Sequence, residues 1–215
     1  MPITQHKTPA LRGRPKAFCR EEALEKALGL FWERSYNAIG VRELSERMGI
    51  GRQSLYDTFG DKHSLYLEAL RLYAEKRLGM AREVLEQPGS PAANLRAFLG
   101  MWKEMLLGLD GPCGCMMVNS STELGQSDPQ VAEVLRAKME QMEAMVTRTL
   151  AAARDAGELA IEQDPTSIAR LMMVAANGLA AIGRAGVDDC LADDVTATLE
   201  HLLFGAPSVS VGAGS

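Results

Sequence analysis

Apolar residues recur at spacings of three and four along almost the whole chain, and this periodicity constrains the fold more than any other feature of the sequence. The spacing places the apolar residues on one face of an α-helix, whereas no long stretch alternates apolar and polar residues as a half-buried strand does. Ala, Leu, Met, Glu and Arg dominate while β-branched residues are sparse, which also favours helices. We therefore predict an all-α protein.

Glycines and capping residues divide this pattern into separate helices. Gly49 and Gly60 each end a helix. Asp128 and Asp164, each followed by Pro, each begin one, because Asp accepts hydrogen bonds from the free amides of a first turn. Asp61 is placed to cap a helix in the same way. The predicted helices span about 20–35, 41–48, 52–59, 62–87, 92–109, 129–156, 165–184 and 189–204, and a sixth in chain order follows residue 113.

Charge is divided unevenly along the chain, whose formal net charge is −5. Residues 1–63 carry 11 Lys and Arg against 8 Asp and Glu, whereas residues 64–215 carry 12 against 20. Only the first part would attract a polyanion, so the two parts suggest two tasks. We predict one domain over 1–63, with residues 1–18 as a loose basic arm, a helical domain over 64–205, and a disordered tail over 206–215.

The composition also limits where the protein works. No apolar run reaches about 18 residues, so we expect no membrane span and no membrane partner. The first residues are polar and basic, unlike a secretory signal. Four cysteines in a chain of this length do not make a disulfide framework, and they fit a reducing cytoplasm.

Two short helices joined by a tight turn at Gly49, and preceded by a supporting helix, are typical of a helix-turn-helix. In that unit the second short helix enters the DNA major groove. Residues expected to pack inside are Val41, Leu44, Met48, Ile50, Leu55 and Phe59 against Leu24, Leu28 and Phe31. Side chains left partly outward on the second short helix are Arg52, Gln53, Ser54, Tyr56, Asp57 and Thr58. Arg and Gln can bond base edges and hydroxyls can bond phosphates, although such a helix pair can also be a plain packing unit.

Residues 13–70 resemble the N-terminal domain of tetracycline-repressor (TetR/AcrR) family regulators. The shared pieces include Gly13-Arg14-Pro15, the Met48-Gly49-Ile50 turn, Ser54-Leu55-Tyr56 and Asp61-Lys62. The resemblance implies an N-terminal three-helix DNA-binding domain, followed by a C-terminal helical domain for effector binding and dimerisation.

The same resemblance, carried over residue by residue, implies which side chains contact double-stranded DNA: Arg14, Arg42, Arg52, Gln53, Ser54, Tyr56 and Lys62. Arg14 would enter the minor groove, Gln53 would read a base, and Lys62 would hold a phosphate together with Tyr56. Asp57 would repel phosphates or accept a hydrogen bond from a cytosine amino group. Cys19 and Gly40 stand where the family usually has good helix caps, so we expect some looseness in this domain.

Methionine is concentrated in the second domain, where ten of the twelve lie between Met80 and Met173. Met is flexible and lines adaptable surfaces, although a methionine row at helical spacing also suits a plain core. The resemblance implies a hydrophobic effector cavity here. Its candidate lining residues are Met101, Trp102, Met105, Met116, Asn119, Met139, Met142, Met173 and Asn177.

The last two predicted helices are rich in small and apolar residues, and such a face should not stay wet. In the family the final two helices pair with those of a second copy. We therefore predict a homodimeric repressor that binds a palindromic operator and is released by a small, largely hydrophobic effector. A helical interaction module without a DNA role is a different class of function that the sequence leaves open.

Cys113 and Cys115 suggest an alternative to regulation by a hydrophobic effector, because a thiol near a helix N-terminus can have a lowered pKa. They would make the regulator a redox or electrophile sensor. Their spacing is not that of a zinc site. His6, His63 and His201 lie in the arm, the first domain and the terminal helix, so none is placed as a base for a catalytic cysteine. We expect no enzymatic activity, no metal and no cofactor.

Overall fold

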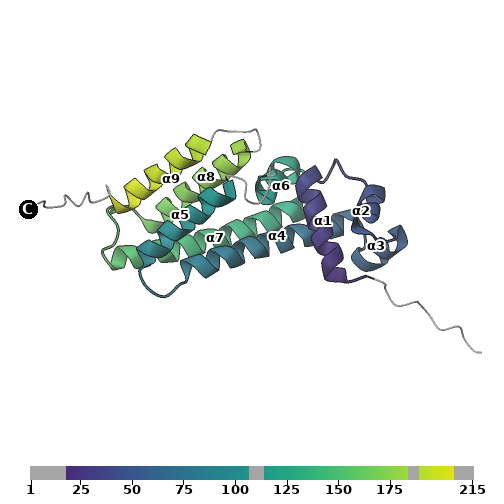
Figure 1. Cartoon of the computed structure of the whole chain (residues 1–215), viewed down its shortest axis with the longest axis horizontal. Helices are drawn as coiled ribbons and strands as arrows, with labels where there is room; N and C mark the ends of the chain where they lie inside the picture. Colours follow the sequence, from purple (N-terminus) through teal and green to yellow (C-terminus); the bar gives the residue numbers. More distant parts are fainter. Residues whose placement is uncertain (1–17, 107–113, 184–188, 206–215) are drawn as a thin grey trace, which may run out of the picture.

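The structure is a computed structural model that describes residues 18–106, 114–183 and 189–205. Within these ranges it contains nine α-helices and no strand (Figure 1). The helices are α1 (Arg20–Arg34), α2 (Val41–Met48), α3 (Arg52–Phe59), α4 (Lys62–Leu85), α5 (Pro91–Leu106), α6 (Met116–Leu124), α7 (Pro129–Asp155), α8 (Pro165–Gly183) and α9 (Asp189–Phe204). The predicted all-α class is confirmed. The basic arm with Arg14, the residues around Cys113 and the tail lie outside the described residues.

Helix ends follow the predicted caps. Asp61 Oδ1 accepts a hydrogen bond from Ser64 N at 2.6 Å, and Asp128 Oδ1 accepts two at the start of α7. Cys19 and Gly40 provide no side-chain cap, as expected. The end of α4 differs from the prediction of about residue 87.

α4 ends at Leu85 because another side chain takes up the carbonyl groups there. The Asn94 amide donates to the oxygens of Leu85 and Gln87, at 3.2 and 2.8 Å. These bonds replace the next helical turn.

α1, α2 and α3, here called the N-terminal unit, gather at one end of the molecule (Figure 1). α4, α5, α7, α8 and α9 form a bundle at the other end, and α6 lies at the junction. One buried cluster joins the N-terminal unit to the first half of α4, to α6 and to the start of α7. A second joins the later parts of α4 and α7 to α5, α8 and α9. The predicted boundary at residue 63 therefore falls within a continuous core, and the division into domains stays a prediction.

Three aromatic rings anchor the first cluster. Tyr66 on α4 meets Phe31 edge-on at 5.0 Å and Tyr36 at 4.8 Å between ring centroids. Such pairs contribute about 1 kcal/mol each beyond the area they bury. Tyr66 also shares a 2.7 Å hydrogen bond with the buried Ser120 hydroxyl, so its polar tip is satisfied.

α8 is unusually apolar for a helix of which so little is buried among the described residues. Its mean hydropathy is 1.3, and only 17% of that apolar window is buried. Val174 is 70% exposed, and Leu171 and Ile182 are also exposed. By length and composition alone this helix could cross a membrane, and a single helix of this kind is weak evidence for a membrane span.

Candidate nucleic-acid interface and cavity

The turn between α2 and α3 depends on Gly49, whose φ of +73° lies in the left-handed region that favours glycine. The Gly49 N–H donates to Glu46 O, and the next N–H, of Ile50, donates to Ser45 O. Leu44 on α2 and Leu55 on α3 are fully buried in the cluster that the N-terminal unit shares with α4. This packing fixes which side of α3 faces outward.

The outward side of α3 carries most of the predicted DNA contacts. Arg52, Gln53 and Tyr56 are exposed, Tyr56 at 46%, and Ser54 is half-buried. Gln53 Nε2 donates to Asp57 Oδ1 at 2.9 Å, one turn further along. The amide keeps a second N–H and its carbonyl oxygen for another partner, the pair that a base edge can use.

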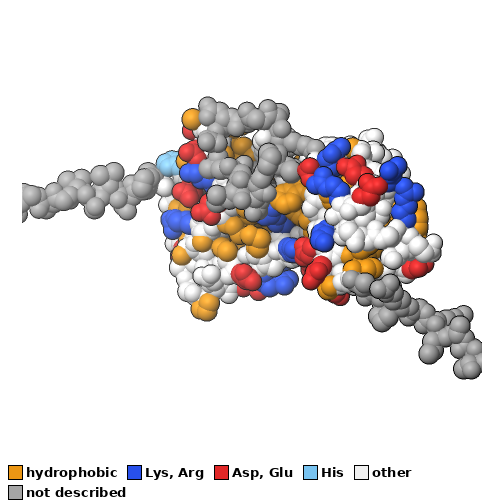
Figure 2. All heavy atoms as spheres, turned by 45° about the vertical axis from the view of Figure 1, so that its right-hand side comes forward, with side chains coloured by type: hydrophobic (Ala, Val, Ile, Leu, Met, Phe, Trp, Pro, Cys, Tyr) orange, Lys and Arg blue, Asp and Glu red, His pale blue; other side chains and the backbone are white. Residues whose placement is uncertain are grey.

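The remaining predicted contacts lie on other elements. Arg42 on α2 is exposed and donates through Nε to Glu46 at 2.8 Å. Lys62, at the start of α4, is half-buried, with its ammonium 4.2 Å from the centroid of the Tyr36 ring. Burial lowers the pKa of Lys62, although Glu123 opposes this effect. Figure 2 shows Lys and Arg side chains interspersed with acidic ones over this end of the molecule. Contact of these residues with DNA stays a prediction.

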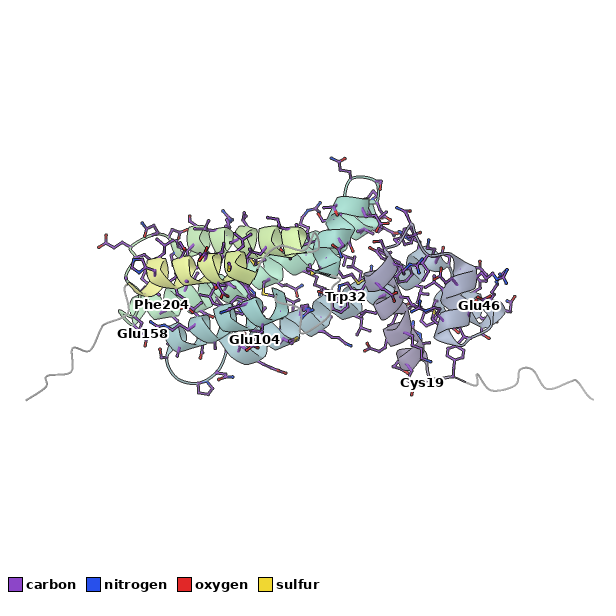
Figure 3. The ribbon with its side chains drawn as sticks, turned by 45° about the horizontal axis from the view of Figure 1, so that its top comes forward. Cys19, Trp32, Glu46, Glu104, Glu158 and Phe204 are labelled. Atoms are coloured by element: carbon purple, nitrogen blue, oxygen red, sulfur yellow. The ribbon has the colours of Figure 1, made fainter. Side chains whose placement is uncertain are left out.

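Hydrogen bonds tie α6 and Gly114, which lies just before it, to the N-terminal unit. The Glu123 carboxylate accepts from the backbone N–H groups of Tyr36 and Asn37, at 3.1 and 2.8 Å. Trp32 Nε1 donates to Gly114 O at 2.7 Å, and Figure 3 shows Trp32 at this junction. Sequence reasoning missed these links because their partners lie more than 80 residues apart in the chain.

His63 belongs to the same junction. It is half-buried and lies 2.5 Å from Asp128, between its Nε2 and the Oδ2 atom. Burial acts to raise the pKa of Asp128, but hydrogen bonds from the Val131 N–H and from His63 outweigh it and hold that pKa below its usual value. His63 thus links the start of α4 to the start of α7.

A cavity of about 610 Å³ lies among α4, α5, α6, α7 and α8. It is large enough for a drug-sized ligand. Seven of the nine predicted pocket residues line it: Met101, Trp102, Met105, Met139, Met142, Met173 and Asn177. That they bind an effector stays a prediction.

Met116 and Asn119 are not among the residues that line the cavity. Met117, Val118, Ser121 and Thr122 face it, and on a helix this set forms one side. Met116 is 2% exposed and packs in the cluster shared with the N-terminal unit. α6 carries apolar residues on both sides, so the sequence does not distinguish the side that lines the cavity from the side that packs in the core.

Polar groups on α4 and α7 also line the cavity, and they were not among the predicted residues. Tyr73 and Arg77 on α4 and Lys138 on α7 reach it. Burial raises the pKa of Tyr73, and the neighbouring Cys115 thiol acts in the same direction. Nothing in a long amphipathic helix marks which inward positions face a void rather than a neighbour, so no sequence signal identified them.

The cysteines are spread over the molecule. Cys115 is half-buried at the start of α6 and lines the cavity, whereas Cys19 and Cys190 are exposed elsewhere. Cys113 lies outside the described residues. Among the described side chains, no three from His, Cys, Asp and Glu converge where a metal ion could bind.

A glycine-turned helix pair with a polar outer face, joined through one long helix to a bundle with a cavity, defines the class of helix-turn-helix transcriptional regulators. Comparison with known proteins gives the family. Residues 23–69 match the model described as bacterial regulatory proteins, tetR family, and residues 91–199 match the tetracyclin repressor-like, C-terminal domain. The chain belongs to the TetR family.

Relatives and solved structures agree with this assignment. The chain is 32% identical over 192 residues to the uncharacterized HTH-type transcriptional regulator YezE of Bacillus subtilis, covering 88% of this chain and 99% of that one. It is 27% identical to the HTH-type transcriptional repressor ComR of Escherichia coli, covering 81% and 84%.

The TetR family regulator CifR, solved as a cysteine mutant with 26-bp operator DNA, superposes with a TM-score of 0.76 at 26% identity, over 87% of this chain and 98% of that one. The protein is thus a DNA-binding transcriptional regulator.

Proposed function

We propose that the protein is a cytoplasmic, homodimeric repressor that leaves a palindromic operator when a small, largely hydrophobic compound fills the cavity. The observation that carries this proposal is the position of α6. One side of α6 lines the cavity through Val118 and Ser121, while Glu123 on the same helix holds the backbone of the N-terminal unit. The repressor ComR, a relative, supports repression over activation.

Occupation of the cavity acts through this shared helix. Packed interiors switch between discrete arrangements rather than deforming smoothly, so a compound pressing on α6 favours a second arrangement of the helix. The bonds from Glu123 and from Gly114 then carry the shift to α1. The compound releases DNA only to the extent that it binds the released state more tightly.

Dimerisation is supported by the exposed apolar surface of the last two helices. Val174 and Leu171 on α8, and Leu202 on α9, leave a face that water would solvate poorly. A two-fold pairing of this face covers it and presents two copies of α3 to two half-sites of an inverted repeat.

A mobility-shift titration with DNA flanking the gene tests the DNA part of the proposal. We expect a dimer to bind an inverted repeat in preference to a scrambled duplex, with affinity falling as salt rises because counterions are released. Equal affinity for both duplexes at moderate salt would contradict it. Compounds that stabilise the protein against heat are then added to the complex to test release.

A second candidate is thiol sensing, and the position of Cys115 in the cavity wall beside Tyr73 favours it. Alkylation of the protein with N-ethylmaleimide would then weaken operator binding. Cys115→Ser should abolish this sensitivity, while Cys190→Ser, which removes an exposed thiol on α9, should leave it intact. Full sensitivity in the Cys115→Ser variant excludes Cys115 as the sensor.

A further inference from the structure

Lys62 is held in a different way from several arginines around it. Four arginines of the N-terminal unit each form an ion pair with a glutamate: Arg20, Arg34, Arg42 and Arg47. Lys62 forms no ion pair with the described side chains, and its ammonium lies 4.2 Å from the centroid of the Tyr36 ring. A phosphate must compete with the glutamate for an ion-paired arginine, whereas it can approach Lys62 without displacing a carboxylate.

The Tyr36 ring is itself fixed by its surroundings. It packs against Tyr66 at 4.8 Å and stacks on Phe31 at 6.3 Å between ring centroids. Its backbone N–H donates to the Glu123 carboxylate at 3.1 Å. Core packing and a hydrogen bond therefore keep this ring in place beneath the Lys62 ammonium.

Two opposing effects act on the charge of Lys62. Burial lowers the pKa of Lys62, and the Glu123 carboxylate acts against this effect. The face of a ring attracts a positive charge without taking up an individual N–H group, so the contact with Tyr36 uses none of the three ammonium donors. The helix dipole disfavours a cation in a first turn, so the position of Lys62 does not serve the stability of α4.

We propose that Tyr36 is a positioning residue for DNA binding, because its ring holds the Lys62 ammonium where a backbone phosphate of the DNA can accept a hydrogen bond from it. This inference rests on the proposed function, in which Lys62 contacts the operator backbone. A lysine side chain that is ordered before binding loses less conformational entropy when it meets the phosphate. The α6 link then ends at the DNA, since Glu123 binds the backbone of the residue whose ring holds Lys62.

Fluorescence anisotropy of the full-length protein with two duplexes tests the inference. One duplex is the inverted repeat flanking the gene and the other is a scrambled sequence, since a phosphate contact does not depend on base sequence. Lys62→Gln should weaken binding to both and lower the slope of log affinity against log salt by about one per contact. Tyr36→Leu should weaken binding to both about two- to fivefold, the size of a cation–π contact at a partly exposed site.

Paired variants distinguish a positioning role from a structural one. Tyr36→Phe keeps the ring and should keep the affinity. Tyr36→Leu should cost nothing further when Lys62→Gln is already present, because the side chain that the ring positions is gone. Phe31→Leu, the matched control, removes another ring of the same cluster, and any loss that it causes should be equal in both backgrounds.

Three results would overturn the inference. If Tyr36→Leu costs as much affinity in the Lys62→Gln background as in the wild-type one, the ring only supports the fold. If Tyr36→Leu strengthens binding, the ring keeps Lys62 away from the DNA. If Lys62→Gln changes neither the affinity nor the salt slope, Lys62 does not meet a phosphate.

Proton NMR of the free protein tests the contact even where Tyr36→Leu does not fold. The ε-methylene resonance of Lys62, identified by its loss in Lys62→Gln, should be shifted upfield by the ring current of Tyr36, and an ordinary chemical shift overturns the inference.

The two duplexes separate this inference from the proposed function. If the wild-type protein prefers the inverted repeat but Tyr36→Leu binds as the wild type does, the proposed function stands and the inference falls. If the wild-type protein binds both duplexes equally, operator recognition falls, while the coupling between Tyr36 and Lys62 is still measured on either duplex.

Discussion

At the scale of single residues, acidic side chains hold the polar face of the N-terminal unit in place. Asp57 binds the amide of Gln53 on the outer side of α3, and Asp61 caps α4 next to Lys62. Each carboxylate also places a negative charge near the surface that we expect to face DNA phosphates. These carboxylates weaken nonspecific binding to DNA, but they hold the base-reading side chain in a defined orientation.

The Gln53–Asp57 pair gives a prediction with opposite outcomes for its two members. Asp57→Ala should raise affinity for an unrelated duplex about two- to fivefold, because one repulsive charge is lost. Gln53→Ala should leave that affinity unchanged and cost about 1–3 kcal/mol at the operator. Fluorescence anisotropy at fixed salt measures both, with the exposed Glu83→Ala on α4 as a control. No rise in nonspecific affinity for Asp57→Ala would place Asp57 away from the duplex.

Asp61 gives a prediction in pH. Hydrogen bonds from the Ser64 backbone N–H, and then from its hydroxyl, hold the pKa of Asp61 below its ordinary value. A carboxyl whose pKa is depressed on folding stabilises the protein above the unfolded value, and this contribution is lost as pH falls through the folded value. Asp61→Ala should therefore lower the free energy of unfolding by about 1 kcal/mol at pH 7. Urea titrations should give a smaller difference below about pH 4, and a constant difference would contradict the cap.

At the scale of elements, the sequence predicts most helix ends, but it predicts only in part which side of a helix faces the cavity and which packs in the core. Caps such as Asp128 act on amides two and three residues away, so local spacing carries their signal. The early end of α4 depends on Asn94 across a loop. Met116 was predicted to line the pocket because apolar character does not distinguish a cavity wall from a core, and Asn119 because it is a polar residue beside an apolar run; neither is among the residues that line the cavity. Glu123 and its partners in the N-terminal unit are distant in sequence, so spacing could not reveal them.

α6 yields a prediction on coupling. Glu123→Ala removes two hydrogen bonds to the N-terminal unit and should raise the effector concentration needed for half-release of DNA several-fold. Binding of the effector without DNA should change little, because Glu123 is not among the residues that line the cavity. The exposed Glu133→Ala on α7 serves as the matched control. If release is unchanged in Glu123→Ala, α6 does not transmit the signal through this carboxylate.

At the scale of the whole molecule, the exposed apolar face of α8 is the surface through which we propose that the dimer forms. Val174→Lys should convert a dimer to monomers by placing a charge in the buried seam, and operator affinity should fall about tenfold or more since both half-sites no longer bind together. Met80→Lys makes the same kind of change at an exposed position of α4, and this variant should remain dimeric. Light scattering after size exclusion distinguishes monomer from dimer. If the Val174→Lys protein is still a dimer, the dimer interface does not include this face of α8.

The core that runs past residue 63 also limits how this regulator can be recombined with its relatives. A chimera joined at that residue would keep Trp32 and Tyr36 but replace the Gly114 and Glu123 groups that bind them. Helix α3 of this chimera would fold. Its response to an effector, however, would depend on whether the new C-terminal part happens to contact Trp32 and Tyr36 in the same way. A transplantable DNA reader from this protein therefore consists of the N-terminal unit together with the first half of α4 and α6, two stretches that are separate in the gene.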